Sequence, residues 1–575
     1  VRCTFRSPES YVLPLRELIQ EGGLSMETID NRVRDILRVK FLTGLFDTPY
    51  QTDLALADKE VNSEAHQQVA LQASREGLVL LKNANNLLPL DKSQIKRIAV
   101  CGPNADEASF ALTHYGPVAV EVTTVLEGIK QQVKEGTKVT YTKGCDLVDT
   151  NWPESEIISY PLTAEEKTEI QKAVDNVKES DVAVVVLGGG IRTCGENKSR
   201  TSLDLPGHQQ QLLEAIVATG KPVVLVLING RPLSINWADK FVPAILEAWY
   251  PGSQGGTAIA EALFGDYNPG GKLTVTFPKT VGQIPFNFPA KPASQVDGGQ
   301  TPGMKGNQSR INGPLYPFGY GLSYTTFEYS NLQLSSPVIT DKEPVTVTCK
   351  IKNTGTRSGD EVVQLYTRDV VSSVTTYEKN LRGFERVHLE PGETKEVSFQ
   401  LLPRDFQLLN KDNHWVVEPG MFQIMIGASS EDIRLKKGLE IRAYGQASAN
   451  EIIESDPRDF ISASKNKSHI IHVVDGDYST TWKGEKGEYI SFELAENAKV
   501  DRINVAWKNA EAGTHYEIQI SSGGGQFLPV QRGEVTPNQE ETIRFNKTGG
   551  SDLRILITNG SAEIAEIKLP ELRKE

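Results

Sequence analysis

Five short apolar segments alternate with four helix-like segments between residues 96 and 265. Apart from 138–144, these segments show no regular polar alternation, which is typical of strands that are buried on both faces. They lie at 96–102, 138–144, 181–188, 222–229 and 244–250, and the helix-like segments lie between them at 124–136, 164–180, 208–220 and 257–265. This order predicts an α/β three-layer sandwich around a mostly parallel sheet.

The chain on either side of this region follows other patterns. Residues 13–45 and 66–83 have helical periodicity, whereas residues beyond 330 form short β-type runs separated by turn residues. We therefore predict five segments: helices and a linker at 1–60, the α/β sandwich at 61–290, a connecting segment rich in Pro, Gly and aromatic residues at 291–330, a fibronectin-III-like β-sandwich at 331–445 and a second all-β module at 450–575.

Length and charge narrow the class of protein. A chain of 575 residues is too long for one core and predicts about three or four domains. Its net charge of −13 argues against a nucleic-acid partner, because polyanions would be repelled. No apolar run approaches the roughly 18–20 residues that a membrane helix needs. The five cysteines are scattered, without the spacing of a zinc site or a disulfide framework.

The candidate chemistry lies in residues 188–209, GGGIRTCGENKSRTSLDLPGHQ, which follow a predicted strand. Ligands of such sheets bind beyond the carboxyl ends of the strands. Gly190 and Gly195 have the spacing of a phosphate-binding loop, but Glu196 and Asn197 separate them from Lys198. A carboxylate at that place would repel a phosphate, so the sequence disfavours nucleotide binding.

Two other kinds of chemistry are compatible with this loop. Cys194 as a thiol nucleophile would need a neighbouring base, and the nearest histidine, His208, is predicted to begin the following helix. Glu196 on a glycine-rich loop is instead suited to be a general acid that reaches into a pocket. The cations Arg192, Lys198 and Arg200 would then orient it or contact sugar hydroxyls. A solvated surface loop with an incidental salt bridge also fits these residues.

Long motifs resemble glycoside hydrolase family 3, in its bacterial β-glucosidase and β-xylosidase branch. They include VRDILRVKFLTGLFD, REGLVLLKNANNLLPL, GENKSRTSLDLPGHQ, AILEAWYPGSQGG and YPFGYGLSYTTF, and the resemblance covers roughly residues 10–445. It implies a (β/α)8 barrel before an α/β sandwich, with sugar bound between them. It also implies that Glu196 is the acid/base, because Arg200 and LPGHQ match the family's loop pattern. Ser199 departs from the aspartate of many members.

The resemblance also implies something that the sequence does not contain. The nucleophile of the family is an aspartate in a Ser-Asp-Trp motif on the barrel, and this motif is absent from the chain. The chain starts without Met, at the place of the last barrel helices, so we interpret it as the C-terminal part of a retaining exo-β-glycosidase. We expect the isolated chain to be inactive, and to associate or form a homodimer through surface that normally packs on the barrel.

The remaining expectations about function also follow from the resemblance. The first substrate class is terminal β-D-glucosyl residues of oligosaccharides or β-glucosides, with β-xylosides as the alternative and no cofactor for catalysis. A protein of another class, a non-catalytic carbohydrate-binding protein with a relic sandwich, is a further alternative. The family places the protein in the periplasm or outside the cell.

The last 125 or so residues resemble a discoidin-like (factor 5/8 type C) β jelly roll, a module that often binds sugars. The segment VDGDYSTTW is similar to one that holds a structural calcium ion there. The resemblance implies oxygen ligands from Asp475, Asp477, Thr480 and Glu566, although an ordinary Asp-Gly turn explains the segment equally well. Trp482 and Trp507 lie in strand-like runs and are expected in the core.

Overall fold

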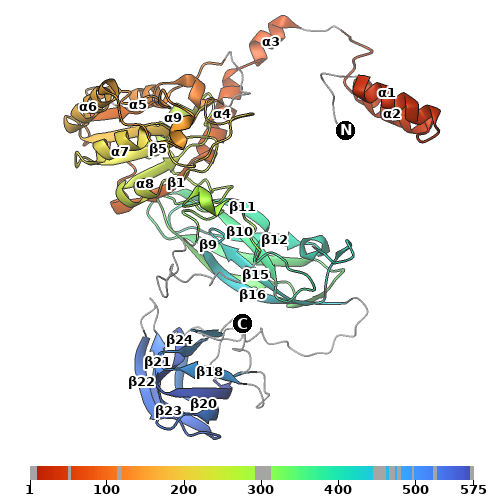
Figure 1. Ribbon diagram of the computed structural model, residues 1–575, viewed down its shortest axis with the longest axis vertical. Helices are drawn as coiled ribbons and strands as arrows, with labels where there is room; N and C mark the ends of the chain where they lie inside the picture. The colour runs from red at the N-terminus through yellow and green to blue at the C-terminus, as the bar shows by residue number, and fades with distance from the viewer. Residues whose placement is uncertain are drawn as a thin grey trace. The chain divides into compact units, whose positions relative to one another are not determined.

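The computed structural model describes residues 9–49, 53–112, 120–133, 135–291, 313–443, 461–464, 473–474, 481–494, 498–521 and 527–569. The chain divides into two compact units, Val1–Ala70 and Leu71–Glu575. Figure 1 shows the α/β part in orange to yellow and two β-rich parts in green to cyan and in blue. No helix in the described ranges is long and apolar enough to cross a membrane.

The described residues of the first unit are mainly helical. The helices are α1 (Glu9–Gln20), α2 (Met26–Leu42), α3 (Leu54–Glu60) and the start of α4 (Glu64–Gly77). Ser25 begins α2, because its hydroxyl accepts a hydrogen bond from the Thr28 N–H. The apolar side chains of α2 stay open to solvent in this unit, with Ile36 61% and Phe41 63% exposed.

A six-stranded sheet forms the centre of the α/β sandwich, in the order β1-β6-β5-β4-β2-β3. Its strands are β1 (Val79–Asn83), β2 (Arg97–Cys101), β3 (Lys138–Thr142), β4 (Val182–Gly188), β5 (Val223–Ile228) and β6 (Ala244–Glu247). Five strands are parallel and β1 is antiparallel to β6. The mostly parallel sheet is confirmed, but the helix predicted over 66–83 is wrong at its end, since α4 stops at Gly77 and β1 follows.

Alternate residues of each strand face two separate cores, which makes three layers. One face is covered by α5 (Val125–Gln132) and α9 (Gly255–Phe264), and the other by α6 (Ala164–Lys178), α7 (Gln209–Val217) and α8 (Asn236–Phe241). In β4, for example, Val184 and Val186 face the first core, and Val185 and Leu187 the second. Burial on both faces explains why the strands read as continuous apolar runs.

The next domain is a β-sandwich whose larger sheet has the order β11-β10-β15-β16-β8 and whose smaller sheet has the order β12-β9-β7. Its strands are β7 (Phe327–Leu334), β8 (Val338–Thr340), β9 (Val345–Asn353), β10 (Gly359–Asp369), β11 (Asn380–Leu389), β12 (Thr394–Leu401), the hairpin β13 (Leu408–Leu409) and β14 (Trp415–Val416), β15 (Gly420–Gly427) and β16 (Ile433–Arg442). A buried ion pair, Lys272 Nζ to Glu361 Oε1 at 3.0 Å, joins it to the α/β sandwich.

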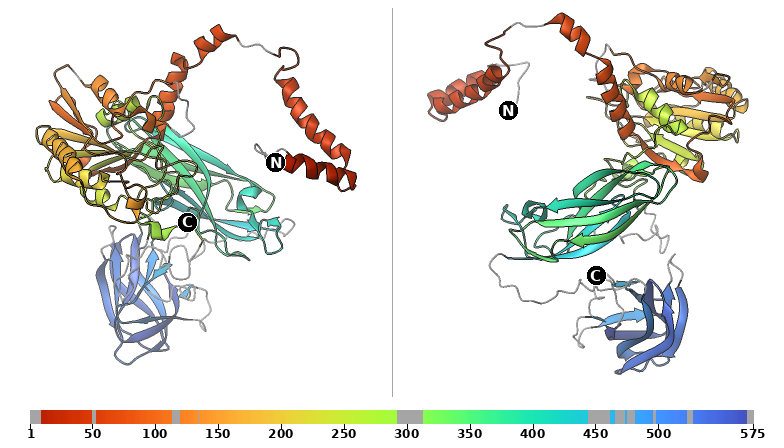
Figure 2. Two further views of the ribbon diagram at one scale, coloured as in Figure 1. Left: turned by 45° about the horizontal axis from the view of Figure 1, so that its top comes forward. Right: turned by 180° about the vertical axis from the view of Figure 1, so that it is seen from behind.

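The C-terminal module has two sheets, β17-β19-β24-β21-β22 and β18-β25-β20-β23, drawn in blue in Figure 2. The strands are β17 (Ile461–Ala463), β18 (Trp482–Glu485), β19 (Tyr489–Glu493), β20 (Lys499–Ala510), β21 (His515–Ser521), β22 (Phe527–Glu534), β23 (Glu540–Gly549), β24 (Asp552–Asn559) and β25 (Ser561–Lys568). Trp482 and Trp507 are buried in the core between the sheets, as predicted.

Candidate active site

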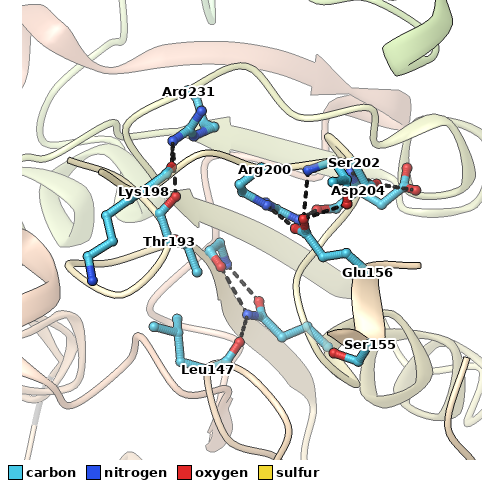
Figure 3. Close-up of polar contacts among 12 residues, drawn as sticks. Leu147, Ser155, Glu156, Thr193, Lys198, Arg200, Ser202, Asp204 and Arg231 are labelled. Carbon is cyan, nitrogen blue, oxygen red and sulfur yellow. Dashed lines mark hydrogen bonds and ion pairs between the residues drawn. The ribbon is translucent and has the colours of Figure 1, made fainter. Parts of the chain in front are cut away.

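The loop that carries Glu196, residues 189–200 (the Glu196 loop), leaves the carboxyl end of β4 at Gly188. Gly188 has a φ of +134°, and a Cβ there would lie 2.2 Å from the Ile228 carbonyl oxygen, so only glycine fits. The fully buried Gln209 fixes this point. Its Oε1 accepts from the Gly188 N–H at 2.8 Å, and its Nε2 donates to the carbonyls of Gly188 and Leu147 at 2.9 and 2.8 Å (Figure 3).

Glu196 lies at the corner of a tight turn in this loop. The Lys198 N–H donates to the Gly195 carbonyl at 3.2 Å, which closes the turn around Glu196 and Asn197. Asn197 has a φ of +60°, a conformation that asparagine tolerates better than most residues. Glu196 is exposed, so the turn presents its carboxyl group at the carboxyl edge of the sheet, where ligands of parallel sheets bind.

Arg231, just beyond the end of β5, holds both sides of this turn. Its Nη2 donates to the Lys198 carbonyl at 2.6 Å and to the Thr193 carbonyl at 3.1 Å (Figure 3). The Cys194 Sγ makes a further contact, 3.4 Å from the Gly230 carbonyl oxygen. The Glu196 loop is therefore tied by side chains to the segment that follows β5.

The four predicted site residues of the loop differ in their exposure to solvent. Arg192 and Lys198 are exposed, like Glu196. Arg200 has only 3% of its side chain exposed, because it pairs with Glu156 and also donates to the Asp204 carbonyl at 2.9 Å. Figure 3 shows the Arg200 and Glu156 groups together, apart from Arg231 and Lys198. The structure thus places Arg192 and Lys198 in the solvent-facing part of the loop and Arg200 at its buried base.

Glu156 completes the base of the loop from a segment distant in sequence. Its Oε2 accepts from the Thr201 N–H at 2.7 Å and from the Thr201 hydroxyl at 2.9 Å. The Arg200 guanidinium also lies 5.3 Å from the centroid of the Trp152 ring. A buried carboxylate with several donors is a strong anchor, and removing one partner of such a pair is strongly destabilising.

His208, the histidine nearest in sequence to Cys194, is engaged elsewhere. Its Nδ1 lies 2.8 Å from Glu166 Oε1 and its Nε2 lies 3.3 Å from the Tyr160 carbonyl oxygen. Burial alone would raise the pKa of Glu166, but hydrogen bonds from the Thr163 N–H and from His208 lower it below its usual value. The pair fastens α7 to α6 and so fixes the end of the LPGHQ segment.

A buried polar group that the sequence analysis missed lies beneath the loop. Glu247, at the end of β6, is fully buried, and its Oε1 accepts from the Trp249 N–H at 2.9 Å. Asn229 Nδ2 lies 3.4 Å from Glu247 Oε2 and donates to the Arg231 carbonyl at 2.7 Å. Burial raises the pKa of Glu247 to about 8, although the hydrogen bonds from the Trp249 N–H and the Asn229 side chain favour the carboxylate.

This pKa predicts that rising pH destabilises the chain through Glu247. The folded chain keeps the Glu247 proton up to about pH 8, whereas the unfolded chain releases it near the usual value of 4.5. Between these values the unfolding free energy should fall by up to about 1.4 kcal/mol per pH unit for this group. Thermal unfolding at pH 5, 6.5 and 8 should show a steeper loss of stability for wild type than for Glu247→Gln. Parallel pH profiles would contradict this prediction.

Of the four predicted calcium ligands, only Glu566 lies among the described residues. Asp475, Asp477 and Thr480 lie outside the described residues. Glu566 lies on β25 and is buried, with 7% exposed. The described ranges contain no group of three or more metal-ligating side chains. The calcium site therefore stays a prediction.

Comparison with known proteins assigns three of the domains to families. Residues 78–324 match the glycosyl hydrolase family 3 C-terminal domain, residues 361–430 the fibronectin type III-like domain and residues 459–568 the F5/8 type C domain. An α/β sandwich with an acid-bearing loop and these two companions defines a multidomain protein of the glycoside hydrolase class. The chain belongs to glycoside hydrolase family 3, which confirms the family resemblance.

The relatives include β-xylosidases and β-glucosidases. Beta-xylosidase of Formosa agariphila is 43% identical, with 73% of this chain and 56% of the relative covered. Periplasmic beta-glucosidase of Salmonella typhimurium is 39% identical, with coverage of 75% and 57%. The solved β-glucosidase of Listeria innocua superimposes with a TM-score of 0.65 at 33% identity, with coverage of 75% and 58%. The chain thus spans little more than half the length of these relatives.

Proposed function

We propose that the chain supplies the general acid/base, Glu196, of a retaining exo-β-glycosidase. The observation that carries this proposal is the exposed Glu196 at a closed turn, at the carboxyl edge of the parallel sheet of a family 3 C-terminal domain. A carboxyl group fixed at a sheet edge and open to solvent has access to a sugar bound against that edge. Arg192 and Lys198, exposed on the same loop, contact sugar hydroxyls in this proposal.

Glu196 acts twice in the proposed reaction. It first donates its proton to the departing glycosidic oxygen, and its carboxylate then removes a proton from the incoming water. The nucleophile is a second carboxylate, on a (β/α)8 barrel that carries Ser-Asp-Trp. No cofactor takes part. We call this chain joined to the barrel of the Formosa relative the barrel-bearing enzyme.

The proposed substrates are terminal β-D-glucosyl residues of oligosaccharides. The barrel-bearing enzyme is expected to release aryl groups from aryl β-glucosides with a higher kcat/KM than from aryl β-xylosides, because the solved structures that this chain resembles are β-glucosidases. Steady-state rates with matched glucoside and xyloside give the ratio. A ratio in favour of the xyloside would assign the second candidate, a β-xylosidase, which the 43% identical relative favours.

The same assay separates the enzyme from a protein of another class. A non-catalytic carbohydrate-binding protein would bind oligosaccharides through its C-terminal module and turn over neither substrate.

We further propose that the C-terminal module binds sugars with a structural calcium ion, and that the protein works in the periplasm or outside the cell. Isothermal titration with oligosaccharides, with and without a calcium chelator, tests the module independently of hydrolysis.

A further inference from the structure

We propose that Arg231 is a positioning residue that fixes the Glu196 carboxyl for proton transfer. The inference rests on the proposed function of Glu196 as the acid/base. The Arg231 guanidinium bonds the carbonyls of Thr193 and Lys198, which lie three residues before and two residues after Glu196. One rigid group therefore bridges the two ends of the segment that carries the acid.

The segment between these two anchors lies at the surface of the domain. Residues 195–199 are exposed, and the turn itself is closed by one backbone hydrogen bond, from Lys198 to Gly195. Gly195 has a φ of +137° and adds backbone freedom that other residues lack. Loss of the Arg231 bridge would release both flanks of this turn and so shift the Glu196 carboxyl. A displacement of about 1 Å in a reacting group is enough to lower a rate by roughly 10²-fold.

Arg231 is itself held by the ends of two strands. Its carbonyl accepts a hydrogen bond from the side chain of the buried Asn229. The backbone N–H of Asn229 donates in turn to the Trp249 carbonyl at 3.1 Å. Trp249, with an unusual φ of +55°, is fixed in turn by the buried Glu247 carboxyl. The ends of β5 and β6 thus form a rigid support, which positions a catalytic group better than a loop alone.

Glycine at position 230 lets the loop rest directly on this support. A Cβ at Gly230 would lie 2.4 Å from the Tyr250 ring and 2.7 Å from the Cys194 Sγ. The Cys194 thiol can therefore approach the Gly230 carbonyl, and the two contacts of Arg231 extend this attachment to the far side of the turn. The planar guanidinium suits this task, because it presents its donors in a fixed fork, whereas a lysine ammonium on a flexible stem does not.

The first experiment uses the 575-residue chain and needs no activity. Millisecond hydrogen–deuterium exchange of the Cys194 and Lys198 amides, which bond within the loop, reports its order. Arg231→Ala should speed their exchange by about 10-fold or more, with Arg231→Lys intermediate. Arg97→Ala is the matched control, since it removes a half-buried arginine with one ion pair at the opposite edge of the sheet. Unchanged exchange in Arg231→Ala would overturn the proposal.

The second experiment measures catalysis in the barrel-bearing enzyme. Arg231→Ala should lower kcat for poor leaving groups by about 10–100-fold, with a smaller loss for activated aryl groups, and KM should change little. It should have no added effect in a Glu196→Gln background, because it acts through that carboxyl. An equal loss in both backgrounds would show that Arg231 acts elsewhere and overturn the proposal. A Glu196→Gln enzyme with normal rates would instead refute the proposed function, while the exchange experiment still decides whether Arg231 orders the loop.

Discussion

The 575-residue chain by itself is expected to release no aryl group from aryl β-glucosides or aryl β-xylosides. A retaining glycosidase needs two carboxyl groups about 5–5.5 Å apart, one as nucleophile and one as acid/base. Glu196 is proposed for the second role, and none of the six tryptophans follows a Ser-Asp pair. Nitrophenolate release from both substrates, followed by absorbance, measures the activity.

The control must separate weak activity of the chain from traces of host glycosidases. Glu196→Gln in the same 575-residue chain, purified in parallel, sets this background, and the barrel-bearing enzyme at equal molar concentration sets the positive signal. Wild-type chain and Glu196→Gln should give the same low rate. Turnover by the wild-type chain at the rate of the barrel-bearing enzyme, lost in Glu196→Gln, would show that the nucleophile lies within these 575 residues.

The α/β sandwich was predictable because its strands are buried on both faces, which leaves a continuous apolar run in the sequence. The same property hid β1. Val79–Asn83 continues directly from α4, and a short apolar run next to a helix gives no periodicity that separates helix from strand. What makes it a strand is its antiparallel pairing with β6, more than 160 residues away, and local pattern does not contain that information.

In the candidate site, too, only the features that are local in the sequence were predictable. The glycines, the acid among basic residues and the strand before it made Glu196 a candidate, and the family resemblance implied its role; these features are local in the sequence. The partner of Arg200 was not predictable, because Glu156 belongs to a segment 44 residues earlier. Arg231 and Glu247 were missed for the same reason. They come from the ends of neighbouring strands, which the fold brings under the loop, and the NGRPLS segment shows no catalytic pattern of its own.

Glu196→Gln in the barrel-bearing enzyme is expected to slow hydrolysis most for substrates with poor leaving groups. An alkyl or sugar oxygen must receive a proton as it departs, whereas an activated aryl oxide scarcely needs one. General acid catalysis contributes about 10²–10⁴-fold, so hydrolysis of alkyl glucosides or cellobiose should fall by that factor. The first step with an activated aryl glucoside should fall far less. A series of aryl glucosides of graded leaving-group pKa measures the difference.

The second half of the reaction gives an independent readout of the same residue. With an activated substrate, the glycosyl-enzyme of Glu196→Gln should form and persist, because its hydrolysis needs a base to take the proton from water. Azide is a nucleophile that needs no such base, so added azide should restore turnover and give a β-glycosyl azide. Lys240→Gln, at an exposed cation on α8 outside the loop, controls for a general effect of an added amide. Equal losses for good and poor leaving groups, without azide rescue, would leave Glu196 a role in sugar binding or loop structure and remove it from proton transfer.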